Sequence, residues 1–379
     1  MKKYLSLLFS IIILFSSCTK EEDLFDINAE RLPLLVTNPN NFADQNINQQ
    51  TRDLYNRLIE ITQSGIAFGQ QQPFGTGNNF PVNNELDNDF FEVTGDHPAI
   101  AGFDLELIGL QPEGSFLEGF INQFAEKVIQ AHENGSIITI SWHYANPNGF
   151  SLLGDRRNFN GIVTSLLEGG QFRESFIQRL ERAALLLNRL VDTNGNPIPV
   201  LFRPWHEMNG DFFFWGEGFR TTEEYKQLWR DTVQILSNQF NVHNLIYVYA
   251  PNFVSSRSEY LRNYPGDDFV DLLGIDVYDF RNRRFLNTAI KNLQIVEEIA
   301  TEKNKLFALT ETGLTNLVNN NWFTESLYKA IRSSSISYAM IWRNDMTNFF
   351  HAPFLGHPSE ADFNEFLNKE IILLSTELF

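Results

Sequence analysis

Cysteine is almost absent from this chain of 379 residues, in which Cys18 is the only one. An internal disulfide is therefore impossible, and a cysteine-ligated metal site is excluded for the same reason. The seven histidines include no His-x-His spacing of the kind that holds zinc. We therefore expect no metal site in this protein.

Basic residues are also scarce, because 29 lysines and arginines stand against 47 acidic residues, giving a formal charge of −18. Such a surface repels nucleic acids and anionic membranes, so a polynucleotide substrate or nucleic-acid partner is not expected. No apolar run is long enough to cross a bilayer. Apolar residues make up 43% of the chain, which predicts a folded body with room for one large barrel or two ordinary domains.

The amino terminus has the pattern of an export signal. Lys2 and Lys3 precede a short apolar run over residues 4–15, which is followed by small residues and Cys18. Residues 1–17 resemble a lipoprotein signal peptide with Cys18 as the lipidated first residue, although Leu14 lies one place further from the cysteine than usual. An ordinary cleaved signal peptide is the alternative interpretation.

An acidic stretch, residues 19–23, follows the cysteine directly. It resembles the export tag of surface-exposed bacterial lipoproteins, and a solvated linker is the alternative. We therefore expect an outer-membrane lipoprotein at the cell surface rather than on the periplasmic face, touching the membrane only through Cys18. Residues 18–50 are rich in Asn, Asp and Gln, and we expect a tether that then wraps onto the body.

Residues 51–379 alternate short apolar runs with helical patterns, which predicts βα units around a parallel sheet. The predicted strands are 66–69, 99–106, 137–143, 200–202, 245–250, 272–278, 306–310 and 338–344, and the predicted helices 52–63, 116–133, 172–190, 222–237, 288–302, 322–332 and one from 360 onward. Eight such units predict an α/β fold, a single-domain (β/α)8 TIM barrel, expected to be a monomer.

Polar residues gather at the carboxyl ends of these runs, and in a barrel these ends share one rim. They are Gln70, Asp104, Glu106, Trp142, His143, His206, Glu207, Asn252, Asp276, Tyr278, Glu311, Trp342 and Arg343. The densest stretch, residues 199–216, carries Glu207, and a second carboxylate, Glu311, ends the seventh run. Two carboxyl groups across a cleft suit glycosidic cleavage, in which one stays protonated and the other ionised. Composition does not say which is which.

Several segments together resemble glycoside hydrolase family 26. They are VTGDHPAIAGFD at 93–104, SWHYANP at 141–147, RPWHEMNG at 203–210, GIDVY at 274–278, ALTETG at 308–313 and AMIWRND at 339–345. The resemblance runs from about residue 50 to about residue 360. It implies a retaining, cofactor-free mechanism that uses two glutamates on a β-linked polysaccharide, most often β-1,4-mannan.

Carried over to this chain, the resemblance makes Glu207 the acid/base and Glu311 the nucleophile. The other implied substrate contacts or supporting residues are His143, His206, Phe212, Trp215, Asp276, Tyr278, Trp342 and Arg343. Tyr278 is expected to hydrogen-bond Glu311, and Trp215 to stack on a sugar. Phe212 stands where we expect Trp in the family, so it lacks an indole N–H. The family also implies a cis peptide bond between Trp342 and Arg343.

Other interpretations remain open from the residues alone. Glu207 could be a structural ion-pair partner of Arg203, and the histidines and tryptophans could belong to the core. Within the same chemistry, the substrate could be β-1,3-xylan or mixed-linkage β-glucan. A catalytically dead glycan-binding lipoprotein is a further alternative, which the presence of both glutamates disfavours. Loops 144–170 and 344–359 are expected to decide between internal cuts and release of short products, such as mannobiose.

Overall fold

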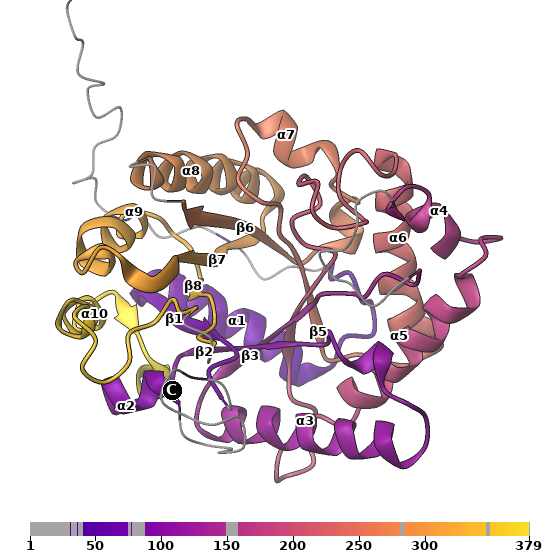
Figure 1. Cartoon of the computed structure of the whole chain (residues 1–379), viewed down its shortest axis with the longest axis horizontal. Helices are drawn as coiled ribbons and strands as arrows, with labels where there is room; N and C mark the ends of the chain where they lie inside the picture. Colours follow the sequence, from indigo (N-terminus) through magenta and orange to yellow (C-terminus); the bar gives the residue numbers. More distant parts are fainter. Residues whose placement is uncertain are drawn as a thin grey trace, which may run out of the picture.

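Eight parallel strands close into a barrel in the computed structural model, which describes residues 31, 36, 41–74, 77, 88–148, 158–280, 284–345 and 349–378 (Figure 1). The strands are β1 Ile66–Gln71, β2 Ile100–Asp104, β3 Ile137–Trp142, β4 Val200–Pro204, β5 Leu245–Tyr249, β6 Leu272–Asp279, β7 Leu306–Leu314 and β8 Tyr338–Ile341. Each pairs with its neighbour in sequence, and β1 pairs with both β8 and β2. The predicted (β/α)8 barrel is confirmed.

Helices surround the strands on the outside of the barrel (Figure 1). They are α1 Gln49–Ser64, α2 Asp89–Thr94, α3 Ser115–Glu133, α4 Ile162–Leu166, α5 Arg173–Leu187, α6 Thr222–Gln234, α7 Arg257–Arg262, α8 Phe285–Lys303, α9 Lys329–Ile331 and α10 Glu360–Leu367. Two π-helical segments, Ile235–Gln239 and Phe323–Tyr328, adjoin α6 and α9, and 3-10 turns occur at Ile108–Leu110, Asp267–Phe269, Thr315–Leu317 and Ser375–Glu377. α6 begins with a capping box between Thr221 and Glu224, as its Thr-x-Glu sequence indicates.

A ninth strand, β9 Ile372–Leu373, was not predicted, and it pairs with the first residues of β1. β1 pairs with β2 only from Gly69 onward, and β9 pairs with the preceding residues Ile66 and Ala67. It therefore covers the part of the β1 edge that β2 does not reach. The helix predicted from residue 360 onward ends at Leu367, because the chain turns there to form this strand.

Arg31 and Ala43, which are described residues before α1, contact the amino ends of the strands. The Arg31 guanidinium donates to the carbonyl oxygens of Gly65 at 2.6 Å and Ser334 at 2.9 Å. Further along, the Ala43 N–H donates to the Asp271 carboxyl group at 2.8 Å. Cys18 and the expected signal peptide lie outside the described residues. Among the helices that are described, none combines the length and the apolar character that a membrane span requires.

Candidate active site

The carboxyl end of β4 makes a tight turn that presents Glu207 to the mouth of the barrel. Trp205 and Glu207 both have a positive φ, +50° and +53°, which is uncommon for residues with a side chain. The Glu207 N–H donates to the Ala250 carbonyl at the end of β5, at 2.8 Å. Strained backbone that its surroundings hold in place is a recurrent feature of active sites. The turn follows Pro204, the last residue of the strand.

The carboxyl group of Glu207 is in surroundings that favour its protonated form. Burial raises its pKa well above the usual value, and the nearby carboxyl groups of Asp276 and Glu311 raise it further. Arg203 acts in the opposite direction but does not pair with Glu207, because its guanidinium contacts Asp276 and Glu311 instead. The alternative interpretation of Glu207 as the ion-pair partner of Arg203 is therefore wrong.

Glu311 lies within β7 at a bulge rather than at the end of the strand. Ile275 pairs with Leu309 and Asp276 with Glu311, so Thr310 is the extra residue of the bulge. Bulges commonly redirect a side chain next to an active site. The strand continues to Leu314, four residues past its predicted end, because the polar residues after Thr310 still pair with β6.

Two donors converge on the Glu311 carboxyl group. The Tyr278 hydroxyl donates to its Oε2 at 2.8 Å, which is the predicted hydrogen bond, and Arg203 Nη2 donates to its Oε1. Arg203 Nη1 also donates to Asp276 Oδ2 at 2.9 Å, and all three charged side chains of this network are buried. Burial raises the pKa of Asp276 to about 8 despite the opposing charge of Arg203.

A chain of three side chains runs beneath one wall of the site, from Asp104 through His143 to His206. Asp104 Oδ2 lies 2.5 Å from His143 Nδ1, and His143 Nε2 lies 3.2 Å from His206 Nε2. Burial lowers the pKa of His143, but the charge and hydrogen bond of Asp104 raise it by more, so the net pKa lies above its usual value. Burial and the charges of Arg203 and His143 lower the pKa of His206 well below its usual value, so its ring is neutral.

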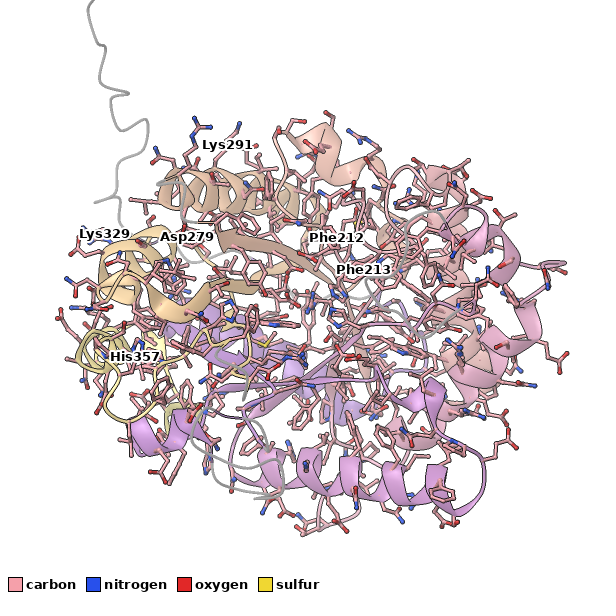
Figure 2. All side chains as sticks on the ribbon, in the orientation of Figure 1. Phe212, Phe213, Asp279, Lys291, Lys329 and His357 are labelled. Carbon is pink, nitrogen blue, oxygen red and sulfur yellow. The ribbon has the colours of Figure 1, made fainter. Side chains whose placement is uncertain are left out.

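These groups surround a cavity of ≈ 370 Å³ at the carboxyl ends of the strands. Its lining residues are Gln71, Asp104, Glu106, His143, Glu207, Phe212, Phe213, Tyr278, Glu311, Trp342, Arg343 and Phe349. Seven of the ten predicted catalytic and substrate residues are among them. Figure 2 shows Phe212 and Phe213 side by side toward the middle of the view, while Lys329 and His357 lie at its edge.

Three predicted substrate residues do not line this cavity. The Trp215 ring is fully buried and its indole N–H donates to the His206 carbonyl at 2.8 Å, so the prediction that it stacks on a sugar is wrong. His206 is equally buried beneath His143, and Asp276 braces Arg203. The peptide bond between Trp342 and Arg343 is trans, as are all the described peptide bonds, so the expected cis bond is wrong. The Trp342 N–H donates to the Thr312 carbonyl at 3.0 Å.

Sequence reasoning missed four residues that line or support the site. Phe213 and Phe349 line the cavity, as does Gln71, where Gln70 was named. The ion-pair interpretation placed Arg203 beside Glu207, whereas its guanidinium contacts Glu311 and Asp276. The alternation of a strand would have placed Arg203 and Gln71 on the inner face, whereas nothing in the loop sequences marks Phe213 or Phe349.

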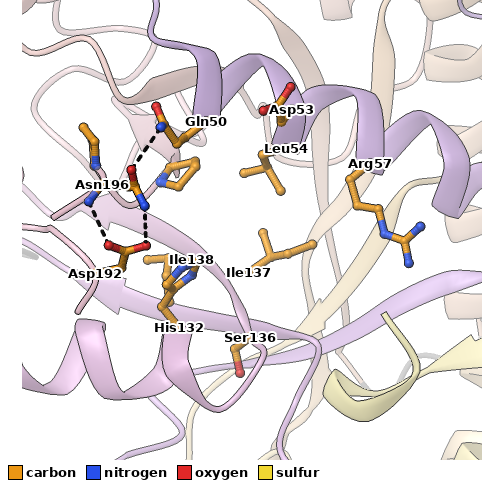
Figure 3. A pocket seen from close by; sticks show the side chains of 12 residues that line it. Gln50, Asp53, Leu54, Arg57, His132, Ser136, Ile137, Ile138, Asp192 and Asn196 are labelled. Atoms are coloured by element: carbon orange, nitrogen blue, oxygen red, sulfur yellow. Dashed lines mark hydrogen bonds between the residues drawn. The ribbon is translucent and has the colours of Figure 1, made fainter. Parts of the chain in front are cut away.

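A second cavity, also ≈ 370 Å³, lies at the opposite end of the barrel, where β3 begins and β4 is about to begin. Leu54, Ile137, Ile138, Pro197 and Pro199 provide much of its lining. Figure 3 shows Asn196 between Gln50 and Asp192, and it donates to the Asp192 carboxyl group at 3.0 Å. This cavity holds no pair of glutamates. In the described part of the chain, no cluster of His, Cys, Asp and Glu is suited to a metal ion.

A barrel that brings two glutamates into one cavity from β4 and β7, in unlike surroundings, is the arrangement of a glycoside hydrolase. The chain belongs to glycosyl hydrolase family 26, whose model matches residues 43–354. A mannan endo-1,4-beta-mannosidase of Bifidobacterium adolescentis is 32% identical over 367 residues, covering 89% of this chain. This chain spans only 36% of that protein, about a third of its length.

Two solved structures agree in fold over nearly the whole body. GH26C from Muricauda sp. MAR_2010_75 is 32% identical with a TM-score of 0.81, covering 89% of this chain and 94% of its own. A GH26 beta-mannanase from Bacteroides ovatus is 31% identical with a TM-score of 0.80, covering 87% and 97%. The family resemblance inferred from the short motifs is therefore confirmed, and it extends over the described barrel.

Proposed function

We propose that this protein is a retaining β-mannanase, which cleaves β-1,4-mannosidic bonds in mannans by a double displacement on Glu207 and Glu311. The observation that carries the proposal is the contrast between the two glutamates of one cavity. The pKa of Glu207 is raised, which suits a proton donor, whereas Glu311 faces a guanidinium and a phenol. The mannan substrate is supported by the names of the similar proteins from Bifidobacterium and Bacteroides.

In the first step, Glu207 donates its proton to the glycosidic oxygen while a Glu311 oxygen attacks the anomeric carbon. The bond to the leaving sugar breaks, its oxygen keeps the proton, and a glycosyl ester forms on Glu311. Tyr278 and Arg203 hold the Glu311 carboxylate in place for this attack, because each donates to a different oxygen. This positioning reduces the entropy cost of reaching the transition state.

In the second step, the ionised Glu207 accepts a proton from a water molecule, which attacks the anomeric carbon from the face that the leaving sugar has vacated. The ester bond breaks, Glu311 regains its carboxylate, and the product keeps its β configuration. Glu207 therefore ends protonated, ready for the next cycle. Both displacements invert the anomeric carbon, so together they retain its configuration.

The experiment is hydrolysis of three polymers by the protein without residues 1–18: linear mannan, β-1,3-xylan and mixed-linkage β-glucan. We expect reducing ends from mannan, with the β anomer released first when products are followed by NMR. A Glu311→Ala variant should be inactive on mannan and on an aryl β-mannobioside, because it forms no ester. Preferred cleavage of xylan or glucan would identify one of the two alternative substrates, and initial release of the α anomer would refute the double displacement.

We further propose that Cys18 is lipidated and anchors the protein in the outer membrane, facing the cell surface. The support is the residue pattern alone, with basic residues, an apolar run and then Cys18. In cells fed a labelled fatty acid, the wild-type chain should take up label and a Cys18→Ser variant should not. Digestion of the wild-type protein by a protease added to intact cells tests the surface location, and protection would indicate the periplasmic face.

A further inference from the structure

Two phenylalanines at the rim of the barrel mouth are unusually exposed for their size. Phe253, after β5, is 46% exposed, and Phe280, after β6, is 64% exposed. Large exposed apolar side chains that gather at one place commonly mark a contact surface. These two line the same pocket of ≈ 190 Å³, together with Tyr278, Arg284, Phe285 and Thr288.

This rim pocket adjoins the catalytic cavity, because one side chain lines both. Tyr278 lines both, and its hydroxyl donates to Glu311 at 2.8 Å. The Phe280 ring lies beyond it, with the two ring centroids 6.4 Å apart. The rim pocket is therefore the immediate neighbour of the cavity on the Tyr278 side of Glu311.

The backbone that carries both phenylalanines is held on several sides. Asn252 forms a bridge with Asp276 of β6, and the Val254 N–H donates to the Asn292 side chain of α8 at 2.7 Å. Next to Phe280, the Asp279 carboxyl group accepts from the Trp322 indole at 3.1 Å. Exposed rings on fixed backbone lose little entropy when a ligand packs against them.

The rim pocket lies on the side of the acid/base. The Asn209 side chain, two residues after Glu207, donates to the Asn252 carbonyl at 2.9 Å and accepts from the Asn252 N–H at 2.8 Å. The loop that carries Phe253 is thus fastened to the loop that carries Glu207. The charged residues Asp104, Glu106 and Arg343 line the cavity from β2 and the end of β8, on the other side of the barrel.

We propose that the rim pocket of Phe253 and Phe280 binds a sugar of the polysaccharide on the leaving-group side of the bond that is cut. The apolar C–H face of a pyranose ring packs against aromatic rings, and its hydroxyl groups point outward to water and to polar groups such as Thr288. The inference rests on the proposed hydrolase function and adds a subsite that favours long substrates over short ones.

The test is a double variant, Phe253→Ala with Phe280→Ala, assayed on two substrates. Mannohexaose has sugars on both sides of the cut, whereas an aryl β-mannobioside has none on the leaving-group side. We expect kcat/KM to fall roughly tenfold on mannohexaose, mostly through KM, and to stay within twofold on the aryl substrate. The matched control is Phe91→Ala, a phenylalanine 42% exposed on α2 that stacks on His97, and it should change neither.

The positions of cleavage in mannohexaose provide a second readout. Loss of a leaving-group subsite should move the cut toward the reducing end, because fewer sugars are then held beyond the catalytic residues. Equal losses on both substrates, or no loss on either, would overturn the proposal. Wild-type protein that cleaves the aryl mannobioside but gains nothing from added leaving-group sugars would also overturn it while leaving the proposed function intact. A wild type inactive on both refutes the proposed function itself.

Discussion

At the scale of single residues, the proposed chemistry depends on the different surroundings of two identical side chains. Glu207 and Glu311 are both glutamates in one cavity, yet one is buried beside other carboxyl groups and the other faces Arg203 and Tyr278. The motifs identified both glutamates, but their different surroundings come from β6 and from the inner face of β4. Those contacts are non-local, so no sequence window could display them.

Replacing Glu207 with alanine should remove both its proposed role as the acid of the first step and its proposed role as the base of the second. Without a proton donor, mannan hydrolysis should fall by roughly 10²–10⁴, the usual contribution of general acid catalysis. Formation of the glycosyl ester from a dinitrophenyl mannobioside should persist, because that leaving group departs without a proton. A pre-steady-state burst followed by slow turnover is the expected time course. Wild-type rates on mannan would contradict the assignment of Glu207 as the acid.

The pH dependence should report the raised pKa of Glu207. The acid acts only while protonated, so kcat/KM on mannooligosaccharides should fall as the pH rises through this pKa, which lies well above its usual value. With the dinitrophenyl substrate the alkaline decline should disappear, since no proton is needed to release the leaving group. The same decline with both substrates would instead assign it to another group, such as His143, whose pKa is also raised.

At the scale of elements, the strands were predictable because each is a short buried run that recurs at regular intervals. The predictions that were wrong concern where a strand ends and which way a side chain points. The polar residues after Thr310 indicated the end of a strand, although a bulge lets them continue pairing with β6. Trp215 was grouped with the sugar-binding aromatics by its position in the motif, but the turn after β4 directs it into the core. Strand β9 is two residues long and leaves no periodicity to detect.

Gly69 lies where β1 leaves no room for a side chain against β2, and Gly69→Ala should destabilise the protein. A Cβ atom at this position would lie 2.2 Å from the Ile100 carbonyl oxygen of β2, and backbone on both sides cannot move aside cheaply. Overpacking of this kind typically costs about 1–3 kcal/mol of the free energy of unfolding. Thermal or urea unfolding should show the loss.

The control for this substitution is Gly119→Ala in α3, where a new Cβ meets no atom within 4 Å. Glycine in a helix interior is less favourable than alanine, so this variant should gain roughly 0.5–1 kcal/mol. Opposite signs for the two variants test the close approach of β1 and β2 directly. If Gly69→Ala is as stable as the parent, the spacing of these strands differs from the one described.

At the scale of the whole molecule, the two ends of the barrel perform different tasks. The carboxyl ends of the strands carry the cavity with the two glutamates, and the amino ends carry the contacts of Arg31. The motifs named seven of the residues that line the cavity at the first end, because each motif holds one or more of them at the end of a strand. They predicted little of the second, because Arg31 meets carbonyl oxygens that lie 34 and 303 residues away.

Arg31→Ala should therefore lower stability without changing catalysis. The substitution leaves the carbonyl oxygens of Gly65, Ser334 and Ile336 without this donor. Burial offsets part of the gain from these hydrogen bonds, because it disfavours the charged guanidinium and lowers its pKa to about 10. A loss of about 1–3 kcal/mol in the free energy of unfolding is expected.

The matched control is Arg257→Ala, whose exposed pairing with Glu302 should contribute less than about 1 kcal/mol. At a temperature where both variants are folded, kcat on mannan should equal that of the parent, because the contact lies at the end of the barrel away from Glu207 and Glu311. A lower kcat at full folding would instead mean that the two ends are coupled through the strands.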